Sequence, residues 1–221
     1  AARAARALLP DALAARTDPL HVVANGDLAA LPFAALPFGG APLVHHRAVV
    51  RVPGLAALGC RSRPWTSTQR FVGDSTEDLP HAAAEVMRLG GSHAVIGARA
   101  TRASILEAKD IDLLHVAVHG RDTATGGALQ LADGRLTTTD IVDAAIGPRV
   151  VMLTGCATSI SADAEAWTSF PSAFLASGSQ HVIATVRSVP DDAAAILVAA
   201  YYREPSTLSP PERLAAAQRA V

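Results

Sequence analysis

Two short apolar segments constrain the fold of this chain more than any other feature. Residues 111–118 have the sequence IDLLHVAV and residues 150–154 have the sequence VVMLT, each with few polar interruptions. A strand with one face in water alternates apolar and polar residues, whereas a nearly continuous apolar run is typical of a strand buried on both faces. The two segments therefore favour a parallel sheet that is covered by other elements on both sides.

Helical patterns alternate with further strand patterns along the sequence. We expect helices over residues 78–89, 101–108, 138–145, 167–177, 190–202 and 210–220, and strands over residues 20–24, 43–50, 70–73, 92–96 and 181–186. A small ribbon is expected over residues 129–136, with its turn at Asp133-Gly134. This alternation predicts βαβ units and one compact α/β domain.

The first part of the chain has a less regular pattern. Residues 1–16 are rich in alanine and predict an amphipathic helix that ends at Thr17-Asp18-Pro19. Because the sequence does not begin with methionine, we interpret residues 1–18 as the end of a preceding helical region. Asn25-Gly26 predicts a hairpin turn directly after the first strand.

Composition and charge exclude several classes of protein. Half of the 221 residues are hydrophobic, which is enough for a large core and excludes a disordered chain. The net charge of −1 gives no basic surface for DNA, RNA or an anionic membrane. The sequence has neither an apolar run of about 18 residues nor a signal peptide, so we expect a soluble, cytoplasmic protein.

Reactive side chains directly follow the two apolar segments. His119-Gly120 follows the first segment, and Gly155-Cys156 follows the second. The helix expected between them supplies a right-handed crossover, which makes the two strands parallel neighbours. Ligands of open parallel sheets bind at the carboxyl ends of the strands. We therefore expect His119 and Cys156 at the same edge of the sheet.

A thiol and an imidazole at one edge suit nucleophilic catalysis. The thiolate is the attacking form, and the imidazole can take its proton and later protonate a leaving amine. Gly120 allows the backbone to approach a substrate, and the N–H groups of Gly120 and Cys156 could bind an oxyanion. The structural alternative is a core cysteine and a capping histidine, and the pattern alone leaves the two interpretations equally open.

The other titratable residues give weaker signals. His115 lies inside the first apolar segment, where a hydrogen-bonded core histidine is expected. His81 and Glu85 are one helical turn apart, which is typical of a solvated contact. Asp191-Asp192 stands at the start of an expected helix, where carboxylates commonly cap the backbone.

Metal and cofactor motifs are not found in the sequence. The histidines and carboxylates have no convincing ligand spacing, and two cysteines, Cys60 and Cys156, cannot form a disulfide framework. Gly126-Gly127 lacks any phosphate-loop pattern. We therefore expect no metal and no organic cofactor.

Four segments together resemble the CHAT domains, which are caspase-like cysteine peptidase domains often attached to tetratricopeptide repeats. The segments are residues 20–36 (LHVVANGDLAALPFAAL), 112–120 (DLLHVAVHG), 150–159 (VVMLTGCATS) and 174–191 (FLASGSQHVIATVRSVPD). The resemblance implies a caspase-like three-layer α-β-α sandwich with a mostly parallel central sheet. It assigns residues 19–221 to the CHAT domain, with residues 19–100 as a degenerate N-terminal half and residues 101–221 as the catalytic half.

The resemblance also implies roles for particular residues. His119 and Cys156 match the catalytic dyad, and Gly120 matches the oxyanion-hole glycine. The order of histidine before cysteine agrees with caspase topology and differs from that of glutaminase-type thiol enzymes. Asp191 matches the aspartate that lines the S1 pocket and selects a basic P1 residue in separase-like members. Arg187 stands where the family usually has tryptophan, and its cation could reduce the negative charge of this pocket.

These assignments imply a cysteine endopeptidase that cleaves a protein partner after a basic residue. We expect a partner or signal to gate the activity, with an N-terminal helical-repeat region or regulatory protein as the source. The polar segment of residues 159–165, just after Cys156, is a candidate loop for this control. The alternative is a catalytically silent CHAT scaffold, and the reactivity of the Cys156 thiol distinguishes the two.

Overall fold

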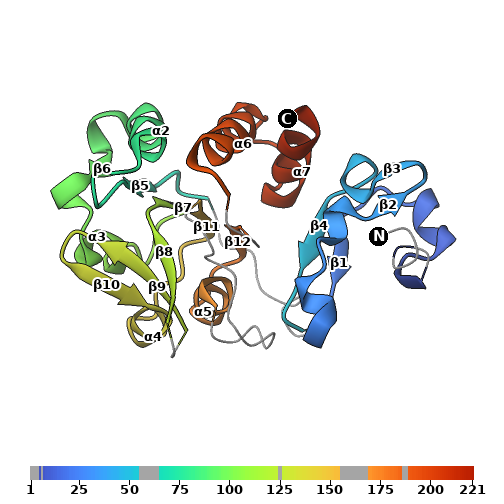
Figure 1. Cartoon of the computed structure of the whole chain (residues 1–221), viewed down its shortest axis with the longest axis horizontal. Helices are drawn as coiled ribbons and strands as arrows, with labels where there is room; N and C mark the ends of the chain where they lie inside the picture. The colour runs from blue at the N-terminus through green and yellow to red at the C-terminus, as the bar shows by residue number, and fades with distance from the viewer. Residues whose placement is uncertain (1–4, 6, 55–64, 124–125, 155–168, 186–188) are drawn as a thin grey trace. The chain divides into compact units, whose positions relative to one another are not determined.

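The computed structural model describes residues 5, 7–54, 65–123, 126–154, 169–185 and 189–221 (Figure 1). Cys156, Arg187 and the segment of residues 159–165 lie outside the described residues. The chain divides into two compact units, one of Ala1–Gly59 with Ile196–Val221 and one of Cys60–Ala195. The expected domain boundaries after residues 18 and 100 stay predictions.

The unit of Cys60–Ala195 is built around a five-stranded parallel sheet. The strands are β5 (Gln69–Gly73), β6 (Val95–Ile96), β7 (Leu113–Ala117), β11 (Val150–Leu153) and β12 (His181–Ala184). Their order is β12-β11-β7-β5-β6, and every neighbouring pair is parallel. The predicted parallel sheet is confirmed, with the two apolar segments at its centre.

Helices cover this sheet on both faces. They are α2 (Pro80–Gly90), α3 (Arg102–Leu106), α4 (Thr138–Asp143) and α5 (Phe170–Ala176). Figure 1 shows α2 on one side of the sheet and α4 and α5 on the other. All residues of β7 and β11 are buried, which explains why these two segments do not alternate with polar residues. The resulting mixed α/β architecture is consistent with the predicted caspase-like sandwich.

The side chains of β7 alternate between these two covering layers. Leu114 and Val116 belong to the main core, which includes side chains of α3, α4 and α5. His115 lies on the opposite face, where its ring contacts Glu85 of α2. On this face, the chain of β5 approaches α2 so closely that a Cβ at Gly73 would lie 2.7 Å from Cγ2 of Val86.

A second, antiparallel sheet follows β7 directly. It consists of β8 (Gly120–Thr123), β9 (Gly126–Leu131) and β10 (Gly134–Thr137), in the order β10-β9-β8. The ribbon of β9 and β10 was predicted. Strand β8 was not, because residues 120–127 are mostly glycine and polar residues and give no strand pattern. At the end of β10, Thr137 and Asp140 form a capping box that starts α4.

The other unit contains two small sheets and the C-terminal helix. Strand β1 (Leu20–Val22) pairs in parallel with β4 (Val49–Arg51), and β2 (Pro37–Phe38) pairs antiparallel with β3 (Ala41–Pro42). Helix α7 spans Pro210–Ala220, as predicted, and α6 spans Asp191–Arg203.

Two local predictions for this unit are wrong. Gly26–Ala30 forms a 3-10 helix instead of a hairpin turn, because the partner of β1 is the parallel strand β4. The single helix expected over residues 1–16 is interrupted at Pro10, and Asp11–Ala15 forms a separate 3-10 helix. Proline has no N–H to continue a helical ladder, which accounts for the interruption.

Candidate active site

His119 lies at the carboxyl edge of the central sheet, two residues beyond the end of β7. Its side chain is 32% exposed. Its backbone carbonyl accepts a hydrogen bond from the N–H of Gln130 at 2.9 Å. The pairing of β8 with β9 begins at the next residue, Gly120, opposite Leu129. The antiparallel sheet therefore fixes the backbone on which the imidazole is mounted.

The same pairing sets the direction of the Gly120 N–H. In an antiparallel ladder, residues alternate between those that bond to the partner strand and those that face away from it. Because the His119 carbonyl bonds to Gln130 of β9, the N–H of Gly120 is directed away from β9. The role of this N–H as an oxyanion donor stays a prediction.

The predicted adjacency of the two apolar strands is confirmed. Val116 of β7 lies opposite Leu153 of β11, and the N–H of Thr154 donates to the carbonyl of Val116 at 3.0 Å. Thr154 is the last described residue before Cys156, which follows two positions later. The contact between His119 and Cys156 therefore stays a prediction.

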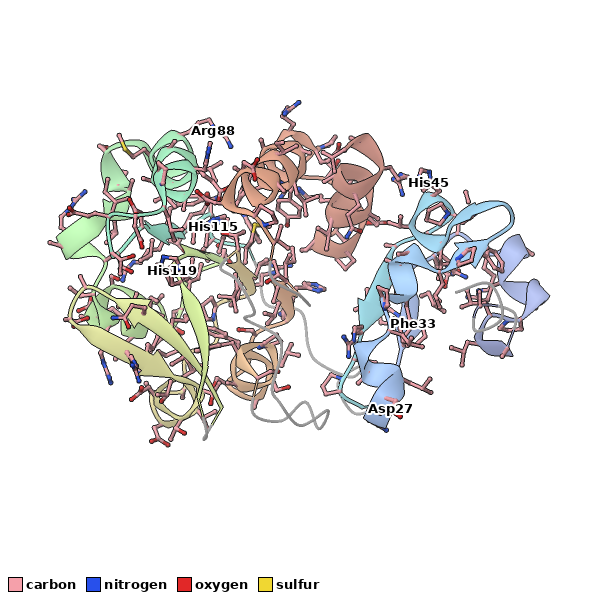
Figure 2. All side chains as sticks on the ribbon, in the orientation of Figure 1. Asp27, Phe33, His45, Arg88, His115 and His119 are labelled. Atoms are coloured by element: carbon pink, nitrogen blue, oxygen red, sulfur yellow. The ribbon has the colours of Figure 1, made fainter. Side chains whose placement is uncertain are left out.

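A small pocket of about 30 Å³ opens beside His119. Its lining consists of Leu79, Ala82, Glu85, Ala117, Val118, His119, Thr154, Val189, Asp191 and Ala194. The pocket thus brings together three chain segments that the sequence placed at the site, namely those of His119, Thr154 and Asp191. Figure 2 shows His119 and His115 between α2 and the antiparallel sheet.

Asp191 is held against the start of α2. Its Oδ2 accepts a hydrogen bond from the backbone N–H of His81 at 3.0 Å. His81 is the second residue of α2, and the first N–H groups of a helix have no partner within the helix. Asp191 therefore caps a neighbouring helix while it lines the pocket. By contrast, Asp192 accepts a hydrogen bond from Ala193 of its own helix.

His115 and Glu85 form a buried pair below the pocket. The imidazole Nε2 lies 2.8 Å from Oε1 of Glu85, and the two side chains are 0% and 4% exposed. The prediction of a hydrogen-bonded core histidine is confirmed. The predicted solvated contact between His81 and Glu85 is wrong, because Glu85 points into the protein toward the sheet. Each of the two side chains can be buried because the other is its hydrogen-bond partner.

A second carboxylate, Asp78, contacts His119 itself. Its Oδ1 lies 2.9 Å from Nε2 of His119 and also accepts a hydrogen bond from the hydroxyl of Thr76. These two hydrogen bonds, that of Thr76 first, lower the pKa of Asp78 below its usual value. An ionised carboxylate only accepts hydrogen bonds, so Nε2 carries a proton, which leaves Nδ1 unprotonated in the neutral ring.

Sequence reasoning assigned Asp78 only to the start of a helix. The signal that would have found it is the polar segment of residues 74–78, DSTED, which follows β5 at the same edge of the sheet. Because β5 is the neighbour of β7, the loop after β5 lies beside the loop that carries His119.

Hydrogen bonds within this loop fix the backbone near Asp78. Asp74 has a positive φ of 43°, and its Oδ1 accepts a hydrogen bond from the N–H of Leu79 at 2.8 Å. Its own N–H donates to the carbonyl of Ala117 at 2.9 Å. The hydroxyl of Ser75 donates to the carbonyl of Gln130 at 2.6 Å. The two polar groups of the Gln130 backbone therefore bond to the His119 loop and to the Asp78 loop.

Comparison with known protein families agrees with this geometry. The model of the CHAT domain family matches residues 1–221. The chain belongs to the CHAT domain family. The resemblance drawn from the four sequence segments is thereby confirmed, and CHAT domains are related to caspase-like peptidases. No curated protein matches the chain.

The described part of this CHAT domain gathers three of the four predicted site residues at one edge. His119 and Asp191 line the same pocket, and Gly120 begins the strand beside it. Within the described ranges, no three His, Cys, Asp or Glu side chains lie close enough together to hold a metal ion. No helix among the described residues has the length and apolar character required to cross a membrane.

Proposed function

We propose that this CHAT domain is a cysteine endopeptidase in which Cys156 is the nucleophile and His119 is the general acid and base. The observation that carries the proposal is the parallel pairing of β7 with β11, which directs His119 and Thr154 into one pocket. Cys156 follows Thr154 by two positions, and two peptide units span at most about 7 Å. This short connection supports the proposed pairing of the thiol with the imidazole.

The proposed reaction begins with proton transfer from the Cys156 thiol to His119. The thiolate attacks the carbonyl carbon, a C–S bond forms, and the N–H groups of Gly120 and Cys156 stabilise the oxyanion. The C–N bond then breaks while His119 protonates the leaving amine. Water, deprotonated by His119, attacks the thioester, which releases the new carboxyl terminus and restores the thiol.

We further propose that the peptidase prefers a basic residue at P1. The Asp191 carboxylate supports this preference because it lines the pocket beside His119. A guanidinium or ammonium group would form a charge-assisted pair with it. The pocket measures only about 30 Å³, which is small for a long basic side chain, so we expect binding at P1 to widen it.

This need for widening fits a gated activity. A partner protein, or a helical-repeat region of the same protein, would open the pocket in the cytoplasm when a signal arrives. The catalytically silent CHAT scaffold is the second candidate function. The observation that favours it is the same small volume, since a scaffold needs no room for a substrate side chain.

Labelling with a thiol-reactive peptide probe tests the two functions. An acyloxymethyl ketone that carries arginine is added to the chain, alone and in the full-length protein, and adducts are located by mass spectrometry. The peptidase proposal expects an adduct on Cys156 that is lost in Cys156→Ala, weakened in His119→Ala and unchanged in the matched variant Cys60→Ala. A wild-type chain that stays unlabelled in both forms favours the scaffold. Faster labelling by an aspartate probe contradicts the basic preference.

A further inference from the structure

The Asp78 carboxylate contacts the imidazole of His119. The proposed reaction gives this carboxylate no role. We propose that Asp78 is a positioning residue, which holds the imidazole of His119 with Nε2 toward the carboxylate and Nδ1 toward the thiol. This inference rests on the proposed function and deepens it. It adds a third residue to the predicted pair of His119 and Cys156.

The hydrogen-bond chemistry of the imidazole supports this role. A neutral ring carries one proton, on either Nε2 or Nδ1, and only the unprotonated nitrogen can take a proton from a thiol. The Asp78 carboxylate, 2.9 Å from Nε2, selects the form protonated at Nε2. The lowered pKa of Asp78 keeps the carboxylate ionised at neutral pH. Nδ1 is then the acceptor in nearly every neutral ring.

Backbone hydrogen bonds near Asp78 and His119 distinguish their contact from an ordinary ion pair on a protein surface. An exposed ion pair gains little because two flexible side chains must be ordered to form it. Here the Gln130 backbone bonds to the carbonyl of His119 at 2.9 Å and to the hydroxyl of Ser75 at 2.6 Å. Since both loops are attached to one residue of β9, little further ordering is needed when Asp78 meets His119.

The exposure of the two side chains limits the expected effect. Asp78 is 61% exposed and His119 is 32% exposed, so water competes for the same hydrogen bond. A hydrogen bond to a charged group is weakened by such exposure, and we expect its loss to slow labelling of Cys156 by the probe about tenfold.

The test compares Asp78→Ala with Asp78→Glu, whose carboxylate can still accept from Nε2 and cannot donate to it. Asp110→Ala is the matched control, because Asp110 is an exposed aspartate in the turn before β7. Histidine ring nitrogens are labelled with ¹⁵N, and the His119 signals are assigned by their loss in His119→Ala. The spectra report which nitrogen is protonated, and the arginine probe measures its affinity and the rate at which it labels Cys156.

We expect the wild type and Asp78→Glu to hold the proton on Nε2. Asp78→Ala should mix the two forms and slow labelling of Cys156 by the probe about tenfold with unchanged probe affinity. The Asp110→Ala variant should match the wild type. An unaltered proton position and rate in Asp78→Ala would overturn the proposal.

The ¹⁵N spectra need no catalytic activity, so they separate this inference from the proposed function. If the wild-type Cys156 does not react, the peptidase proposal fails, while the spectra still decide whether Asp78 sets the protonated nitrogen of His119.

Discussion

Two aspartates at opposite ends of the central sheet are both bound by threonine hydroxyls, yet they stand in different surroundings. Asp112, at the start of β7, is fully buried, and its Oδ2 accepts from the N–H and hydroxyl of Thr66 at 2.6 and 2.7 Å. Asp78, beyond the end of β5, is mostly exposed and accepts from Thr76 and His119.

The comparison separates a structural carboxylate from a site carboxylate. Burial alone would raise the pKa of Asp112, but hydrogen bonds from Thr66 and Thr68 outweigh it and leave the pKa below its usual value. The donors to Asp112 are backbone N–H and hydroxyl groups of Thr66 and Thr68, which do not titrate. One donor to Asp78 is an imidazole that can exchange its proton. A carboxylate of the first kind maintains the fold, and one of the second kind suits the positioning role proposed for Asp78.

The largest expected effect tests the structural side of this comparison. Asp112→Ala should lower the free energy of unfolding by about 3 kcal/mol, because it removes a fully buried carboxylate that accepts hydrogen bonds from Thr66 and Thr68. Urea denaturation measures the loss, and Asp110→Ala is the control, with an expected change below about 0.5 kcal/mol. The protonated nitrogen of His119 should not change. A loss as small as that of the control would show that Asp112 does not stabilise the sheet.

The next effect concerns the contact between α2 and β5, which lies between the two aspartates. Gly73→Ala places a methyl group 2.7 Å from Cγ2 of Val86 and 3.2 Å from the carbonyl of Ala117. We expect a loss of about 2 kcal/mol, together with slower probe labelling, since α2 and the Asp78 loop must shift. Thermal and urea unfolding measure the loss in the free energy of unfolding. An unchanged free energy of unfolding in Gly73→Ala would mean that α2 can move away from the sheet at little cost.

The pH dependence of stability should reveal the contribution of the buried carboxylate Asp112. Because folding lowers the pKa of Asp112, its contribution is complete above the usual carboxyl pKa of about 3.9 and is lost as pH falls through the folded-state pKa. The free energy of unfolding should therefore fall more steeply in the wild type than in Asp112→Asn below about pH 4. Urea titrations at several pH values measure this difference. Parallel curves for the two proteins would refute the assignment.

The smallest expected effect tests the site carboxylate. Thr76→Val removes the hydroxyl donor to Asp78, so the pKa of Asp78 should rise toward its usual value. Asp78 stays ionised at neutral pH, and the rate of Cys156 labelling should change about twofold or less at pH 7. A ¹³C titration of the Asp78 carboxyl group follows the pKa. A tenfold loss at pH 7 would mean that Thr76 positions the imidazole directly.

Local sequence patterns predicted the elements that depend on burial alone. The apolar runs of β7 and β11 predicted two strands covered on both faces, and the helix between them predicted their parallel adjacency. The position of His119 at the sheet edge followed from the same reasoning. These features were predictable because a continuous apolar run has few other stable arrangements.

The remaining features depend on contacts between distant segments. Strand β8 forms only because β9 pairs with it, and its own residues carry no strand pattern. The contact of Asp78 with His119 spans 41 positions and requires β5 to be the neighbour of β7. The buried direction of Glu85 depends on its partner His115, which the helical spacing of His81 and Glu85 does not contain.

The shared attachment of two loops to Gln130 has a consequence for how this site can be regulated. Under the proposed gating, a partner that displaced Gln130 would act on the imidazole of His119 and on the loop of Asp78 together, because each is hydrogen-bonded to this residue. The contact that sets the protonated nitrogen would then be preserved, while the position of the ring relative to the end of β11 would change. Such control would act on the distance between the proposed catalytic groups and not on the tautomer of the histidine.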